Sequence, residues 1–381
     1  MKGRTEVRWL LRCFIAIGIP FYDYGAKRNN STLSKVKFTM KVILELFFSS
    51  FGMYIVLNCI VRFEGRGLFL RLTTTAVATT LMLFRLSVAL KRSQMLHLLN
   101  VLKSFKYSKR KRLYRFKKLD IWIAYVFNIG FPLLLSVTFL SFLIQNFEDV
   151  KYSLKPDLMR YCNENSICTI VAIPLYSSAY TLYFFVTPTL CVTMFIFIFM
   201  TYENTLKQKL VEAHYRLMVD MSYQTIERSL SLISEAIKVH KLIEDVLSPS
   251  IFLMYVLVFL NFLNLITINV SNFANTMLNV RTVGCIIIFL WTSGGFFRLT
   301  LKGSILIDVC NLWNYLQQDI VKNCIQKRAY ESSLVLQLLL FHRTAKLNLV
   351  FSGWGMFQLD RSLLLTMVGV IVSYGVLIST I

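Results

Sequence analysis

The residues best suited to transport chemistry lie in the last apolar run of the sequence, Ser362–Ile381. Small and hydroxyl-bearing residues recur there at steps of three or four: Ser362, Thr366, Gly369, Ser373, Val376 and Thr380. Because a helix turns once in ~3.6 residues, these steps place them on one face. Such a stripe either lets helices pack closely or lines a water-filled path for ions. The sequence alone leaves both interpretations open.

A carboxylate and two further charges accompany the apolar runs. Asp360, beside Arg361, would form a cation-attracting ring if several subunits surrounded one axis, whereas within one subunit it would form an ion pair. Charges inside a membrane span are costly and therefore informative. Glu45 and Arg85 lie at matching depth in two neighbouring spans, so we predict an ion pair between them. The alternative is that each side chain reaches separately to the interface.

Motifs for catalysis and metal binding are missing from the sequence. It contains no GxSxG, HExxH, P-loop or GxGxxG motif, and neither the four histidines nor the eight cysteines have the spacing of metal ligands. We therefore expect no enzyme activity, no cofactor and no metal. Cys162 and Cys168 share one predicted external loop and either form a disulfide or stay as two free thiols.

The composition is typical of a polytopic membrane protein. The chain has 381 residues, of which 56% are hydrophobic and 16% charged, and its mean hydropathy is +0.57. A span needs ~20 apolar residues, and seven runs qualify: Met40–Val61, Leu68–Leu90, Ile121–Ile144, Ile167–Met200, Ile251–Val270, Thr282–Phe297 and Ser362–Ile381. We predict an all-α membrane protein with seven transmembrane helices. The shorter run Trp9–Pro20 suggests an interfacial helix.

The distribution of positive charge predicts the orientation of these spans. The net charge is +22, and 33 of the 42 lysines and arginines lie before the first span or between spans 2–3, 4–5 and 6–7. Basic loops stay in the cytoplasm, so we predict a cytoplasmic N-terminus and an extracellular C-terminus. This orientation is opposite to that of a G-protein-coupled receptor. The basic cluster Lys109–Lys118 indicates contact with membrane lipids, and no nucleic acid is expected as a partner.

Two stretches between the spans predict long cytoplasmic helical extensions. Thr189–Ser248 and Ser304–Ser352 contain no Gly or Pro, and we expect Pro249 to end the first. These helices either pack within one subunit or join subunits. We divide the chain into residues 1–39 (cytoplasmic segment), 40–300 (transmembrane helices 1–6 with a ligand-binding bundle and a cytoplasmic extension), 301–361 (cytoplasmic helical anchor) and 362–381 (last helix).

The last thirty residues resemble the C-terminal signature of insect gustatory receptors, which are related to insect odorant receptors. That signature is Thr-Tyr, five apolar residues and Gln-Phe. Tyr374 matches it strictly, whereas Ser373 stands conservatively for Thr, Thr380 for Gln and Ile381 for Phe. The resemblance implies a ligand-gated, non-selective cation channel that assembles as a homo- or hetero-tetramer. The implied pore-lining residues are Thr366, Gly369, Ser373, Val376, Thr380 and Ile381.

The same resemblance implies a ligand pocket in the outer halves of the other spans. Tyr176, Tyr180, Tyr183 and Phe184 share one face of span 4, and we expect Phe142 and Asn264 as neighbours. Tyrosine combines an apolar ring with a polar tip, which suits a small amphipathic ligand. The alternative is an interfacial aromatic belt or a core contact.

The function implied by the resemblance is that of a taste receptor in the plasma membrane of a sensory neuron. Its ligand would be a bitter compound or another small tastant. A G-protein-coupled receptor and a membrane transporter are the alternatives. The former requires the opposite orientation and the latter favours inverted repeats, which the sequence does not display.

Overall fold

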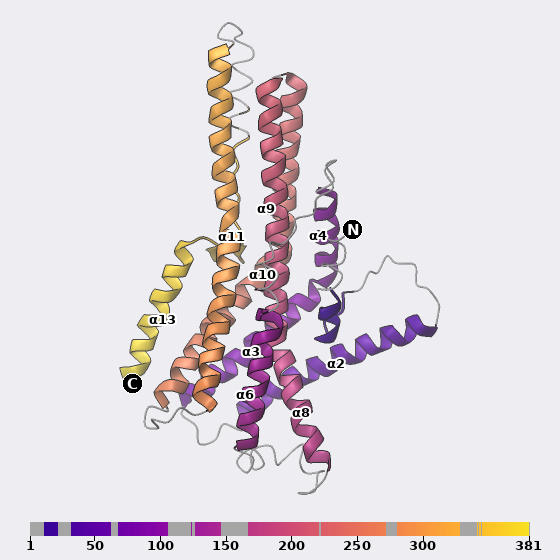
Figure 1. The fold of residues 1–381 in the computed structure, drawn as a ribbon, viewed down its shortest axis with the longest axis vertical. Helices are drawn as coiled ribbons and strands as arrows, with labels where there is room; N and C mark the ends of the chain where they lie inside the picture. The colour runs from indigo at the N-terminus through magenta and orange to yellow at the C-terminus, as the bar shows by residue number, and fades with distance from the viewer. Residues whose placement is uncertain are drawn as a thin grey trace.

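The computed structural model describes residues 11–21, 32–61, 68–105, 123, 126–145, 167–220, 222–271, 280–327, 341, 343 and 345–380. This part of the chain is mainly helical (Figure 1). Five of its helices are long and apolar enough to cross a membrane, and the apolar stretch Ser362–Leu377 is shorter. The chain is thus a multi-pass helical membrane protein.

The first half of the chain contributes short helices and one composite helix. The elements in order are α2 (Thr32–Val61), α3 (Leu68–Leu90), α4 (Arg92–Phe105), the π-helix η1 (Val126–Gly130), α6 (Phe131–Gln145), α8 (Ile167–Thr181), the π-helix η3 (Leu182–Val186) and α9 (Thr187–Val219). The last three follow one another directly. Span 4 therefore continues far past the predicted end at Met200, as the sequence suggested.

The second half contains the longest helices. Its elements are α10 (Tyr223–Ser271), α11 (Val280–Lys327), the two-residue strands β1 (Ser352–Gly353) and β2 (Phe357–Gln358), and α13 (Ser362–Thr380). In Figure 1, α9, α10 and α11 run well beyond α2, α3 and α13. The division drawn at residue 300 falls inside α11, so the membrane part and the extension share one continuous helix.

Polar contacts between helices define how they pair. Asn264 accepts bonds from Thr73 and Thr74, and Ser87 bonds Ser250 at 2.9 Å, so α3 lies antiparallel to α10. In contrast, α9 lies parallel to α11, because His214 pairs with Asp319 at 3.1 Å and Met218, one turn later, pairs with Asn323 at 3.4 Å.

The expectation that Pro249 ends a helix is wrong, because Pro249 lies inside α10. A proline has no N–H and leaves the carbonyl four residues earlier, here that of Asp245, without its usual partner. Lys91, at the corner between α3 and α4, donates to that carbonyl at 3.4 Å. This contact, together with the packing of α3, compensates for the lost helical bond.

The described part of the N-terminal run, residues 11–20, packs into the protein core. Phe14, Ile17 and Ile19 are fully buried in the core. Gly18 adopts φ +68, and a Cβ atom there would lie 2.7 Å from the Leu44 carbonyl oxygen. Only glycine accommodates both the dihedral and the close approach, so this turn depends on its lack of a side chain.

An extended strap, residues 345–351, and a hairpin precede α13. Trp313 of α11 donates its indole N–H to the Ala345 carbonyl at 2.8 Å, which holds the strap along the helix. The hairpin follows, and the Glu244 carboxylate of α10 accepts bonds from both the N–H and the hydroxyl of Ser352. The segment before α13 is therefore attached to both long helices.

We expect Gly18→Ala to destabilise the protein by about 1–3 kcal/mol, since it forces a left-handed alanine against backbone. The measurement is thermal unfolding of the purified protein in detergent. Gly284→Ala is the matched control, because a Cβ atom there meets nothing within 4 Å and alanine favours the helix. Equal melting temperatures for the two variants would contradict the proposed role of the turn.

Candidate functional site: a polar helix face and an intramembrane cavity

The two faces of α13 have different environments. Leu363, Leu364, Met367 and Ile371 pack against the hydrophobic core. The stripe of small and hydroxyl-bearing residues points away from it, with Ser362, Thr366, Gly369, Ser373 and Val376 exposed. Close packing within the subunit therefore does not explain the stripe. Thr380 is the last residue of α13, and Ile381 lies outside the described residues.

The residues near the ends of α13 have clear structural roles. Asp360 accepts bonds from the Leu363 N–H at 2.9 Å and the Ser362 hydroxyl at 2.7 Å, so it caps the helix. Its neighbour Arg361 pairs with Asp308 of α11 at 2.8 Å. Tyr374, from the C-terminal signature, lies edge-on to Phe259 of α10, with ring centroids 5.9 Å apart.

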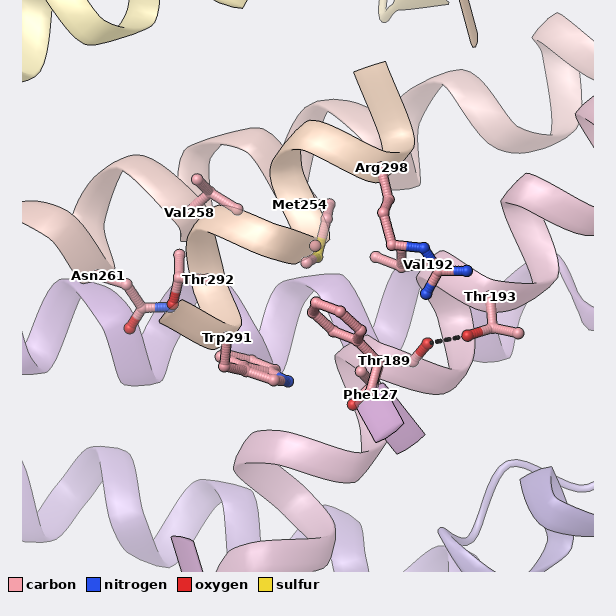
Figure 2. Close-up of a pocket in the computed structure, with 11 residues that line it drawn as sticks. Phe127, Thr189, Val192, Thr193, Met254, Val258, Asn261, Trp291, Thr292 and Arg298 are labelled. Atoms are coloured by element: carbon pink, nitrogen blue, oxygen red, sulfur yellow. Dashed lines mark hydrogen bonds between the residues drawn. The ribbon is translucent and has the colours of Figure 1, made fainter. Parts of the chain in front are cut away.

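A small cavity lies among η1, α9, α10 and α11 (Figure 2). Its lining residues are Phe127, Thr189, Val192, Thr193, Met254, Val258, Asn261, Trp291, Thr292, Gly295 and Arg298. About 10 Å³ is open to the centre of a water molecule, which is about the space that one bound water needs. The lining is apolar with a few polar groups, as in small-molecule sites.

Two polar atoms in the cavity wall lack partners. Trp291 is 4% exposed and Thr292 is 3% exposed, yet the indole N–H of the first and the hydroxyl of the second bond no other described group. A buried polar group without a hydrogen bond costs about 1–3 kcal/mol. The hydrogen-bonding capacity of these two side chains is therefore available to a bound molecule.

On the η1 side the cavity wall is the ring of Phe127, which is held between Gly294 and Arg298. The Phe127 ring lies so close to Gly294 that a Cβ atom there would be 2.2 Å from it. The Arg298 guanidinium lies 5.3 Å from the centre of the same ring, within the range of a cation–π contact.

The predicted tyrosine face exists, and its members contact one another. Tyr180 stacks on Phe184 with centroids 4.4 Å apart, and Tyr176 lies 6.4 Å from Tyr180. Tyr183 is 2% exposed and packs near Gly52 of α2, where a Cβ atom would lie 2.1 Å from its hydroxyl oxygen. Tyr176 and Tyr183 also contact Phe51 of α2, so this face of α8 and η3 packs against α2.

Of the other predicted neighbours, Asn264 lies elsewhere. Asn264 bonds Thr73 and Thr74, both at 3.2 Å, at the contact of α3 with α10. Phe142 belongs to α6, but its side chain is outside the described part, as are Cys162 and the side chain of Cys168. The aromatic cluster reaches the cavity through Phe185, whose ring lies 5.5 Å from that of Trp291.

The prediction of a Glu45–Arg85 ion pair is wrong. Glu45 pairs with Arg92 at 2.8 Å through both oxygens. Arg85 instead donates to the Gly18 carbonyl at 3.0 Å and lies over the rings of Phe48 and Tyr183. The N-terminal segment supplies this partner, and the sequence did not place that segment in the core.

Sequence reasoning missed Trp291, Thr292, Asn261 and Phe127 as cavity residues. One signal could have indicated them. The sixth apolar run is interrupted by Trp-Thr-Ser-Gly-Gly at positions 291–295, which places polar and small residues in the middle of a span.

Comparison with known proteins identifies the fold. No family model and no curated protein matches this chain. The solved structure of the insect olfactory receptor OR5 from Machilis hrabei matches with a TM-score of 0.69 and 14% identity over 99% of this chain and 98% of that one. The same receptor in complex with eugenol matches with a TM-score of 0.69 and 12% identity, over 98% and 97%. The chain therefore has the fold of an insect olfactory receptor.

We expect a double-mutant cycle with Glu45→Gln and Arg92→Gln to give a coupling energy of about 0.5–1 kcal/mol, since both side chains are partly exposed. The measurement is the unfolding free energy in detergent. The cycle with Glu45→Gln and Arg85→Gln should give less. The reverse order of the two couplings would restore the original prediction.

Proposed function

We propose that this protein is a chemoreceptor that acts as a ligand-gated, non-selective cation channel. The observation that carries the proposal is the outward-facing polar stripe of α13 in a chain with an insect olfactory receptor fold. Residues exposed on one subunit and rich in hydroxyl groups are suited to a pore shared by several copies. A single helix cannot enclose a pore, so the channel is a homo- or hetero-oligomer, with a tetramer favoured by the family resemblance.

The orientation inferred from charge supports the same function. A cytoplasmic N-terminus separates the chain from G-protein-coupled receptors. The C-terminal signature favours a taste receptor over an odorant receptor, and a bitter or other small tastant as its ligand. The location would then be the plasma membrane of a sensory neuron.

The cavity is the ligand site that we favour. The OR5 receptor, which has the same fold, has been solved in complex with eugenol. This complex supports a small organic ligand here. A ligand with a hydrogen-bond acceptor could bond the unpaired indole N–H of Trp291, and a hydrophobic ligand would suit the apolar side chains around it. The space in this conformation suffices for a water only, so binding a larger molecule requires the helices to separate.

Contacts of α10 provide a route from this cavity to the pore helix. Val258 and Asn261 line the cavity, and Phe259, between them in sequence, contacts Tyr374 of α13. A ligand that displaces this part of α10 therefore changes the packing under the polar stripe. This coupling is a mechanical hypothesis based on direct contacts.

The first experiment is patch-clamp recording from cells that express the chain, with a panel of small amphipathic compounds. We expect a ligand-evoked cation current that persists when G-protein signalling is blocked with GDPβS. In Ser373→Cys, a charged water-soluble thiol reagent should reduce the current by more than about half, because the stripe lines the pore. Met367→Cys, on the packed face, is the control.

A current that depends on G proteins would refute the channel proposal. Equal modification of both cysteine variants would refute the pore assignment of the stripe. Verified surface expression without any current, alone and with co-expressed receptor subunits, would also count against the channel.

The cavity makes a separate prediction. Trp291→Phe keeps an aromatic ring and removes the N–H donor, so the half-maximal ligand concentration should rise about 2–10-fold for ligands with an acceptor group. The measurement is the dose–response curve. Trp354→Phe is the control, since Trp354 is exposed on the hairpin and does not line the cavity. Identical shifts in the two variants would exclude a ligand bond to Trp291.

A further inference from the structure

A second hollow lies at the corner between α3 and α4, on the side of α10. Its lining residues are Lys91, Ser93, Gln94, His97, Leu242, Asp245 and Val246, and its volume is about 410 Å³. We call it the corner groove. It is much larger than the intramembrane cavity and open to the surroundings, and no part of the proposed ligand site or pore contributes to its lining.

The corner groove carries groups that bind phosphate. Lys91 contributes an ammonium, while Ser93, Gln94 and His97 add side-chain donors. Lys238 and Lys241 add two further ammonium groups beside the groove. They precede the lining residue Asp245 by seven and four residues, so they lie on the same side of α10. Both lysines are exposed and form no ion pair with another described residue. Asp245 supplies the single opposing charge of the lining.

The position of the corner groove matches the surface of the membrane. The apolar helix α3 ends at Leu90, directly before Lys91. On α10 the predicted span begins at Ile251, six residues after Asp245. A rise of ~1.5 Å per residue puts the groove within about 10 Å of the hydrocarbon boundary. Leu242 and Val246 add an apolar floor, which suits the glycerol end of a lipid better than a fully hydrated anion.

We propose that the corner groove binds the phosphorylated headgroup of an anionic membrane lipid, in the leaflet that we infer to be cytoplasmic. That leaflet is rich in anionic lipids, and basic pockets beside membrane helices are suited to them. The headgroup phosphate contacts Lys91 and His97, and Lys241 contacts a further phosphate. Because Lys91 also donates to the Asp245 carbonyl next to Pro249, the lipid binds where α3 supports the proline of α10.

The test uses the full-length protein in nanodiscs of phosphatidylcholine with a small fraction of phosphatidylinositol bisphosphate. Native mass spectrometry then counts the phosphoinositide molecules retained per subunit. Wild type should retain this lipid over phosphatidylcholine. His97→Gln combined with Lys241→Gln should weaken retention at least about fivefold, as expected for the loss of one surface cation. Both side chains are exposed, so these changes should leave the melting temperature unchanged.

The control combines Lys207→Gln with Lys322→Gln, two exposed lysines of the extension that lie outside the groove. It removes more positive charge and should bind the lipid as wild type does. Equal retention in all three proteins would overturn the proposal. So would competition by soluble inositol phosphate at the same concentration as the lipid, because it would indicate a free anion site. The inference does not require a channel, so its outcome is independent of the proposed function.

Discussion

The passage of α10 through Pro249 without a break is the constraint on which the rest of the structure depends. One helix joins the extension, the support of the hairpin at Glu244 and the wall of the cavity. It can continue because α3 lies against it and Lys91 approaches the carbonyl that proline leaves without its N–H. Had the helix ended at Pro249, the cavity wall formed by α10 would no longer be continuous with the extension, and only α9 and α11 would connect the two. Because α10 is one continuous helix, we expect a displacement at one of its ends to move the other end as well.

Buried polar groups in this fold fall into two kinds. Asn264 bonds threonines of α3, and Arg85 bonds the Gly18 carbonyl through Nη2, although its Nη1 has no partner among the described residues. They fix the pairing of helices, since hydrocarbon offers no water as an alternative partner. Trp291 and Thr292 keep unused hydrogen-bonding atoms beside a cavity. The cost of leaving them unpaired is the reason to assign them to binding rather than to packing.

Features with a local cause could be predicted from the sequence, and those set by helix pairing could not. The apolar runs and the two faces of α13 follow from hydropathy and a period of ~3.6 residues. Among the described residues, five helices are long and apolar enough to span a membrane, and α13 has one packed and one exposed face. The partner of Glu45 depends instead on the rotation of α3 and on a buried N-terminal segment. Similarly, the helical spacing predicted that the tyrosines share one helix face, but it could not predict that this face packs against α2 at Gly52. The cavity is lined by residues from η1, α9, α10 and α11, so the pattern of any one apolar run could not predict it.

The contrast between the tyrosine face and the cavity argues for where a ligand can act. The rings of Tyr180 and Phe184 already stack on each other, so a ligand that entered between them would have to break this contact. At the cavity we expect a ligand to gain a bond to the indole N–H of Trp291, which has no partner among the described residues. The two sites meet at Phe185, whose ring touches that of Trp291. If a ligand binds at the cavity as proposed, we expect α10 to move rather than the packed aromatic rings, and α10 contacts α13 through Phe259 and Tyr374.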